Sequence, residues 1–273
     1  MEWPNRLITN KEWRVFTIIV PTHERPLLLS RTLQSLIAQT FTDFRVIIVS
    51  DSATYIPPYD EFVALRGRYT YVIRSDAPGP AESRNLGLDL AKTRYVMFLD
   101  DDDTFEPNHL ESLARHIGEG TPELLFCDFK VRYEDRTTHP PRIESTQSIS
   151  IGSVTSDSVY VLNKIPNSCV IYRNDVVAQA RHDTAMTIYE DWDFLMACLR
   201  GRSLAHVPVD SVVIHKTPAT APENMRRGNS RDDLVVSTML ALYKKHPAPN
   251  HETRLARQAL MASADVRLSL DHF

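Results

Sequence analysis

The chain has 273 residues, a length that predicts one large domain or one domain with an appendage. Hydrophobic residues make up 42% and charged residues 24%, which is typical of a globular protein and argues against intrinsic disorder. The formal net charge of −4 argues against a general electrostatic attraction to nucleic acid, so we expect no nucleic-acid partner.

The cysteines and the apolar runs bear on location. Cys127, Cys169 and Cys198 lie far apart and form no CxxC pair, so the sequence has no zinc-ribbon or thioredoxin-type motif. An odd number of cysteines without a disulfide framework favours a reducing compartment. We find no apolar run typical of a signal peptide in residues 1–13, and no stretch approaches the ~20 apolar residues of a membrane span. We expect a cytoplasmic protein and leave contact with the inner face of a membrane open.

Strands and helices alternate in the first part of the chain. Apolar, β-branched runs predict buried strands, and apolar residues at helical spacing predict helices. The expected strands are residues 15–20, 44–49, 69–73 and 95–99. The expected helices are residues 27–39, 81–91 and a third that begins near Pro107 and ends at Gly118 or Gly120. This alternation is typical of an α/β fold with a doubly wound, mainly parallel sheet and helices on both faces.

The second half is less regular. The pattern predicts strands at residues 124–133, 170–172 and 212–215, and helices at residues 189–200, 234–245 and 252–270. Residues 134–158 are polar and are expected to form a long loop or a hairpin excursion. Residues 216–230 are rich in proline and polar residues, so we expect them to be mobile. The chain thus divides into residues 1–120, 121–231 and a C-terminal helical extension, 232–273.

Polar clusters follow three of the predicted strands. Residues 21–25 follow the first strand, residues 50–52 the second and residues 100–103 the fourth. In a parallel α/β sheet, ligands bind outside the carboxyl ends of the strands. The three clusters are therefore expected to converge on one ligand-binding edge.

The most informative cluster is the run of four aspartates, Asp100–Asp103. Like charges ~4 Å apart repel by about 1 kcal/mol even in water. An acidic run is often a solvated surface or a helix cap, but this run directly follows an apolar strand at the expected binding edge. A divalent cation would turn the repulsion into attraction, and carboxylate oxygens suit Mg²⁺ or Mn²⁺.

Residues 15–117 resemble a family 2 glycosyltransferase of the GT-A fold. The resemblance rests on order, spacing and character in four segments: FTIIVPTHERPLLLSRTLQSLIAQTF, FRVIIVSDSA, PAESRNLGLDLA and YVMFLDDDD. It implies a single GT-A domain whose first part, residues 1–120, binds the nucleotide-sugar donor. Residues 121–231 would bind the acceptor and complete the catalytic site.

The resemblance also implies a donor and metal site. Asp100, Asp101 and Asp102 match the D-x-D motif, which holds the metal ion, Mn²⁺ or Mg²⁺, and the donor diphosphate; Asp102 would be a direct metal ligand. The family's usual Asp-Asp-Gly-Ser is here Ser50–Asp51–Ser52–Ala53, which keeps Asp51 as the contact to the nucleotide base. A carboxylate can accept from the N–H of a uracil-like ring. The full expected set of donor-binding residues is Pro21, His23, Arg25, Asp51, Arg84, Asp100, Asp101, Arg226 and Arg227, and Asn85 lies beside it.

The pair Glu190–Asp191 and the residue His215 gain a role only through the resemblance. Glu190–Asp191 alone is typical of a helix N-terminus, where acids complement the helix dipole. In the family a Glu-Asp pair lies at a helix start beneath the acceptor, so Asp191 is expected to be the catalytic base, with Glu190 beside it. His215 is alternatively a structural histidine or, with Asp100 and Asp102, a metal ligand. Arg226 and Arg227, in the proline-rich segment, are expected to close over the diphosphate.

The expected function is metal-dependent transfer of a sugar, with inversion, from a nucleotide-diphosphate donor to an acceptor hydroxyl. The donor is expected to be a UDP-sugar. The acceptor is expected to be a glycan or a lipid-linked or protein-linked group, in bacterial surface glycan or glycoconjugate synthesis.

Two alternatives to this function remain. Asp100, Asp102 and Thr104 fit the D-x-D-x-T string of a haloacid-dehalogenase-type phosphatase, although that family's nucleophile lies near the start of its core domain. A non-catalytic scaffold or carbohydrate-binding subunit of the same fold also stays open. A dinucleotide dehydrogenase and a P-loop enzyme are disfavoured, because no G-x-G-x-x-G follows the first strand and no G-K-[ST] occurs.

Overall fold

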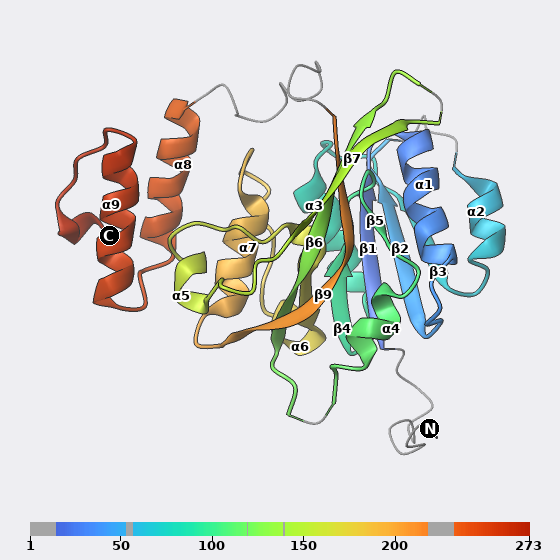
Figure 1. Cartoon of the computed structure of the whole chain (residues 1–273), viewed down its shortest axis with the longest axis horizontal. Coiled ribbons are helices and arrows are strands. Elements are labelled where there is room, and N and C mark those ends of the chain that lie inside the picture. The colour runs from blue at the N-terminus through green and yellow to red at the C-terminus, as the bar shows by residue number, and fades with distance from the viewer. Residues whose placement is uncertain (1–14, 53–56, 119, 139, 218–231) are drawn as a thin grey trace.

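A computed structural model describes residues 15–52, 57–118, 120–138, 140–217 and 232–273. Within these ranges the strands form one nine-stranded sheet, which runs through the middle of the molecule in Figure 1.

The first four strands are parallel, as the alternating pattern predicted. They are β1 (Phe16–Thr22), β2 (Phe44–Ser50), β3 (Tyr69–Ile73) and β4 (Tyr95–Phe98). Every residue of β1 and β4 is buried, which explains why both read as unbroken apolar runs. Because the strands are parallel and in register, their carboxyl ends meet at one edge of the sheet.

The second half of the sheet is mixed. Its strands are β5 (Thr104–Phe105), β6 (Leu124–Asp135), β7 (Arg142–Ile149), β8 (Val170–Arg173) and β9 (Leu204–Lys216). The order across the sheet is β3-β2-β1-β4-β8-β6-β9-β5, and β7 pairs with β6. β8 is antiparallel to both β4 and β6, whereas β6 and β9 are parallel. β6 and β7 form the hairpin that was one of the two expectations for residues 134–158, and it projects beyond the sheet in Figure 1.

Helices surround this sheet. They are α1 (Pro26–Ile37), α2 (Tyr59–Ala64), α3 (Pro80–Leu90), α4 (His109–Ala114), α5 (Ser156–Val159), α6 (Asn174–Val177), α7 (Glu190–Leu199), α8 (Asp232–Lys245) and α9 (His251–Ser263). Two short 3-10 turns are η1 (Asn167–Cys169) and η3 (Leu270–His272). Within the described ranges, no helix has both the length and the apolar character to cross a membrane.

Helix α3 packs unusually close to β1. A Cβ atom on Gly87 would lie only 2.4 Å from Cγ2 of Ile19, so the position has no room for a side chain unless Ile19 moves. This contact holds α3, which carries Arg84 three residues before Gly87, against the strand that ends at the binding edge.

Two predicted helix ends were wrong. The helix expected to reach Gly118 or Gly120 ends at Ala114, and the last helix ends at Ser263 rather than at residue 270. Just beyond the end of α9, Asp265 has a φ of 59°, a left-handed conformation that breaks the helical path, and residues 270–272 form the separate turn η3.

The C-terminal helices α8 and α9 lie beside α5 and α7 in Figure 1 and are anchored by Arg257. This side chain is fully buried. Its guanidinium donates to the carbonyl oxygens of Tyr160 at 2.7 Å, His246 at 2.8 Å and Tyr243 at 3.4 Å. Burial lowers the pKa of Arg257 to about 10. The buried cation satisfies carbonyls at the ends of α5 and α8, which would otherwise lack partners.

We expect Arg257→Met to lower the free energy of unfolding by about 3 kcal/mol, because it leaves buried carbonyl oxygens without donors. Urea denaturation would measure the change. Arg254→Met, on the same helix but with its side chain 36% exposed, is the matched control and should cost about 0.5 kcal/mol. Equal losses in the two variants would contradict the anchoring role.

Candidate active site

The four aspartates form a tight turn between β4 and β5. The backbone N–H of Asp103 donates to the carbonyl of Asp100 at 3.0 Å, which reverses the chain within four residues. The buried hydroxyl of Thr32, on α1, donates to the carbonyl oxygens of Asp101 and Asp103. The turn is therefore fixed to α1, and its four carboxylates have different surroundings.

Two of the four carboxylates, those of Asp101 and Asp103, are buried and hydrogen-bonded to other residues of the protein. Asp101 accepts from the Thr22 hydroxyl at 2.8 Å and from Arg25 at 3.1 Å. Asp103 accepts from the Ser168 hydroxyl at 3.0 Å and from the backbone N–H of His215. Burial raises the pKa of Asp101 to about 6 and the pKa of Asp103 well above its usual value.

The other two carboxylates, of Asp100 and Asp102, reach the surface, with side chains 39% and 28% exposed. Arg84 donates to Asp100 at 2.7 Å. Asp102 lies 3.5 Å from Arg25, beyond a close hydrogen bond. Burial, followed by the neighbouring charge of Asp100, raises the pKa of Asp102. Within the run, the carboxylates of Asp100 and Asp102 are therefore the ones accessible to a ligand.

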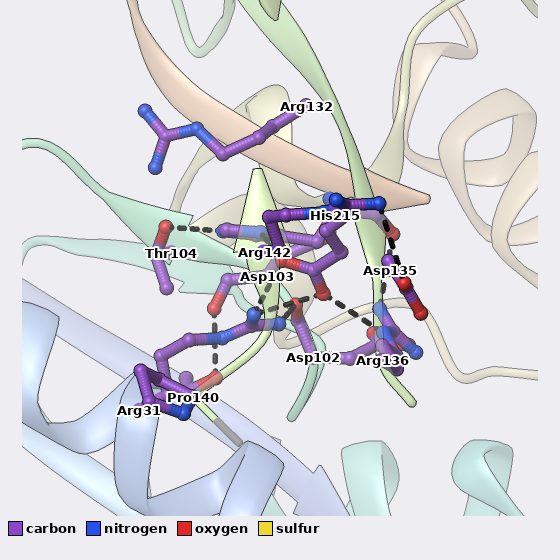
Figure 2. Close-up of polar contacts among 12 residues, drawn as sticks. Arg31, Asp102, Asp103, Thr104, Arg132, Asp135, Arg136, Pro140, Arg142 and His215 are labelled. Atoms are coloured by element: carbon purple, nitrogen blue, oxygen red, sulfur yellow. Dashed lines mark hydrogen bonds and ion pairs between the residues drawn. The ribbon is translucent and has the colours of Figure 1, made fainter. Parts of the chain in front are cut away.

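A buried glutamate, Glu134, lies next to this turn and was not predicted from the sequence. Arg31 donates to both of its oxygens, at 2.9 and 2.8 Å, and Arg136 donates at 2.8 Å. Burial alone would raise the pKa of Glu134, but the donors His215, Arg31 and Arg136 hold it well below its usual range. Arg31 also donates to the backbone carbonyl of Asp102 at 2.9 Å, so the residues around Glu134 also hold the backbone of the turn. Figure 2 shows Arg31, Asp102 and Arg136 near one another.

His215 ends the same network. Its Nδ1 is 2.9 Å from Glu134. Its Nε2 is 2.9 Å from the hydroxyl of Thr104. Figure 2 draws the contact with Thr104 as a dashed line. Burial lowers the pKa of His215, which favours the neutral ring. Both ring nitrogens are engaged, so His215 would have to release Thr104 to bind a metal ion. Nowhere in the described ranges do three or more histidine, cysteine or acidic side chains form a metal cluster.

Asp51 occupies the expected place after β2, but its carboxylate already has partners. It lies 2.6 Å from Nδ1 of His23 and accepts from the backbone N–H of Gly79 at 2.7 Å. Arg74, which follows β3, is 3.5 Å away and was not singled out in the sequence. The predicted pair His23 and Asp51 is thus brought together at the edge of the sheet.

A buried arginine joins the two halves of the site. Arg84, on α3, donates to Asp100 at 2.7 Å through Nη2 and to Glu190 at 2.9 Å through Nη1. Burial would lower its pKa, but the charges of Asp100 and Glu190 hold the pKa of Arg84 above its usual range. The predicted donor cluster and the predicted catalytic pair therefore share one guanidinium.

Glu190 and Asp191 form the first turn of α7. Tyr189, just before them, has a left-handed φ of 62°, so the chain turns sharply into the helix. Burial, followed by the charge of Glu190, raises the pKa of Asp191 to about 6, although Arg84 opposes the shift. One oxygen of Asp191 accepts from the backbone N–H of Trp192. A carboxylate with this pKa is ionised at neutral pH and can accept a proton.

The remaining predicted residues have different positions. Pro21 is buried within β1 beside Val49 of β2. Asn85 hydrogen-bonds the backbone of His182 through both its carboxamide atoms. Arg226 and Arg227 lie outside the described residues. The site residues that sequence reasoning missed are Arg31, Arg74, Glu134 and Ser168; for Arg74, its place directly after a predicted strand was an available signal.

The chain is similar to known glycosyltransferases. The family described as glycosyl transferase family 2 matches residues 17–180. An uncharacterised glycosyltransferase of Haemophilus influenzae is 29% identical over 245 residues, which cover 85% of this chain and 78% of that protein.

Solved structures share the fold. TarS 1–349 of S. aureus, in complex with UDP-GlcNAc, superimposes with a TM-score of 0.68 and 19% identity over 90% of this chain and 71% of that chain. The mannosyltransferase PcManGT from Pyrobaculum calidifontis, in complex with GDP-Man and Mn²⁺, gives a TM-score of 0.61 and 14% identity over 96% of this chain and 78% of that chain. The predicted GT-A fold is therefore confirmed.

The phosphatase interpretation of the D-x-D-x-T string loses its support here. Thr104, which that string requires, has its hydroxyl bonded to His215. The matched family spans β1 to β8 and includes the aspartate turn and Arg84. The chain accordingly belongs to glycosyl transferase family 2, and the enzyme that it forms is a glycosyltransferase.

Proposed function

We propose that this glycosyltransferase moves a sugar from a UDP-sugar to an acceptor hydroxyl, with inversion at the anomeric carbon and with help from Mn²⁺ or Mg²⁺. The observation that carries the proposal is a shared hydrogen-bond donor. The guanidinium of Arg84 donates both to Asp100 of the aspartate turn and to Glu190 of the proposed catalytic pair. The acceptor is proposed to be a glycan or a lipid-linked or protein-linked hydroxyl.

The metal ion would be held by Asp102, with Asp100 beside it. The donor set fits, because both side chains offer partly exposed carboxylate oxygens, and Mg²⁺ is usually held by one or two carboxylates together with substrate phosphates. When bound, such an ion neutralises charge on the departing diphosphate. The Mn²⁺ complex of PcManGT, a protein of the same fold, supports this proposal.

The nucleotide base would lie near Asp51 and His23. A carboxylate of Asp51 can accept from a uracil N–H once it exchanges one of its present partners, His23 or the N–H of Gly79. The UDP-GlcNAc complex of TarS supports UDP as the nucleotide. Arg25, 33% exposed beside Asp101 and Asp102, would face the diphosphate.

Asp191 would take the proton from the acceptor hydroxyl as that oxygen attacks the anomeric carbon. Attack from the side opposite the diphosphate inverts the configuration of that carbon. Glu190 would act by holding Arg84, and through its charge it keeps the pKa of Asp191 raised.

A screen of nucleotide sugars with and without Mn²⁺ would test the proposal. We expect UDP-sugars to raise the melting temperature only with metal present, and NMR of the first product to show inverted configuration. Retention of configuration would contradict the mechanism.

The pH dependence of the reaction follows from Asp191. Its pKa is raised to about 6, and the base must be ionised to accept a proton. We therefore expect kcat/KM for the donor to be level above pH 7 and to fall about tenfold per pH unit below pH 6. Rates measured from pH 4.5 to 8 would give the profile.

Glu190→Gln is the control for this profile. The amide oxygen can still accept from Arg84, but the negative charge that raises the pKa of Asp191 is removed. The fall in kcat/KM at acid pH should then occur at a lower pH than in the wild-type enzyme. If the fall in kcat/KM at acid pH occurred at the same pH in Glu190→Gln, it would report the titration of a group other than Asp191.

A further inference from the structure

Asn167 lies beside the aspartate turn. It is the first residue of η1, directly before β8. β8 is antiparallel to β4, and the pairing ends at Met97 opposite Ile171. The residues before Ile171 therefore lie next to those after Met97, and the neighbour Ser168 donates to Asp103 at 3.0 Å.

The side chain of Asn167 is buried yet without hydrogen bonds. The residue is only 8% exposed, and neither Nδ2 nor Oδ1 has a partner within the described part of the chain. A buried polar group without a partner costs about 1–3 kcal/mol of folding stability. Such groups in a native structure call for an explanation, and a missing ligand is one.

Other asparagines of the chain have carboxamides that hydrogen-bond to the backbone and so stabilise the local structure. Asn163, four residues earlier, uses both its carboxamide atoms on the backbone of Ile165. Asn174 donates to the carbonyl of Thr93 at 2.8 Å. Asn167 differs from both, because its donor and its acceptor remain unused at the ligand-binding edge of the sheet.

We propose that Asn167 is a specificity-determining residue that hydrogen-bonds the hydroxyls of the sugar carried by the donor. A carboxamide offers donors and an acceptor side by side, and adjacent sugar hydroxyls can both accept and donate. The sugar attached to the diphosphate is the one in reach, since η1 contacts the turn that would hold that diphosphate. This inference rests on the proposed function.

A comparison of UDP with UDP-sugars isolates the sugar contact. Calorimetry with Mn²⁺ would measure the Kd of UDP, UDP-N-acetylglucosamine and UDP-glucose for the wild-type protein, for Asn167→Ala and for Asn167→Asp. We expect the tighter of the two UDP-sugars to bind about tenfold more weakly to Asn167→Ala, with the Kd of UDP unchanged. Asn167→Asp preserves the size of the side chain but loses the donors, so it should also weaken the UDP-sugar.

Asn163→Ala is the matched control, since its carboxamide is used by the loop itself; it should weaken neither ligand. Equal weakening of UDP and UDP-sugar by Asn167→Ala would overturn the inference, because it would mean that the turn near Asp103 was disturbed. Unchanged affinity for both ligands would overturn it as well. If the wild-type protein bound none of the three ligands, the proposed function would fail first, and the inference with it.

Discussion

Asp191→Asn is expected to lower kcat by about 10²–10⁴-fold while the affinity for UDP changes little. Asparagine preserves the size of the side chain and can still accept from the backbone N–H of Trp192, so the start of α7 should survive. What is lost is the proton acceptor. Steady-state kinetics and calorimetry with UDP and Mn²⁺ would separate the two effects.

Asp193→Asn, on the same helix, is the control for Asp191. Asp193 is buried and accepts from His246 at 2.7 Å and from Lys245 at 2.9 Å, so it joins α7 to the C-terminal helices. Its substitution should reduce stability but leave the kcat of the folded enzyme near normal. If Asp191→Asn behaved in the same way, Asp191 would only cap a helix.

Asp102→Ala is expected to weaken metal-dependent binding of UDP by about 100-fold or more. Outer residues that merely support a metal ligand cost 10–100-fold when changed, and a direct ligand should cost at least the upper end of that range. The fold should survive, because removal of one acid relieves repulsion from Asp100, one cause of the raised pKa of Asp102.

Calorimetry with UDP, with Mn²⁺ and then with EDTA, would measure this loss. The wild-type protein in EDTA should resemble the variant in Mn²⁺. Asp89→Ala, which removes an exposed partner of Arg181 away from the turn, is the matched control and should bind UDP normally. Undiminished binding by Asp102→Ala would remove this residue from the metal site.

The sequence predicted the binding edge because three of the first strands are mostly apolar and buried. Strands β1 and β4 are wholly buried and β2 is buried except for Arg45. Polar residues begin within one or two residues of the end of each of these strands. The parallel topology then brings Thr22, Asp51 and Asp100 to one edge without any knowledge of side-chain packing. Short elements such as β5 and α2 carry too few residues for a periodic signal and were missed.

Which of the four aspartates are buried and which are partly exposed could not be predicted in this way. Asp101 and Asp103 differ from Asp100 and Asp102 through partners that lie far away in the sequence, such as Thr22 and Ser168. Glu134 was hidden for the same reason. It lies near the end of β6, where the sequence becomes polar. Only the fold shows that this one acid is buried between Arg31, Arg136 and His215.

The bridge through Arg84 has a thermodynamic consequence. Its buried guanidinium is balanced by one carboxylate from the aspartate turn, Asp100, and one from the start of α7, Glu190. Removal of either acid changes the electrostatic balance of the other, so substitutions at these two positions will not have additive free energies. A substitution at Asp100 should therefore alter the electrostatic surroundings of Asp191, the proposed base, even though Asp191 itself is unchanged.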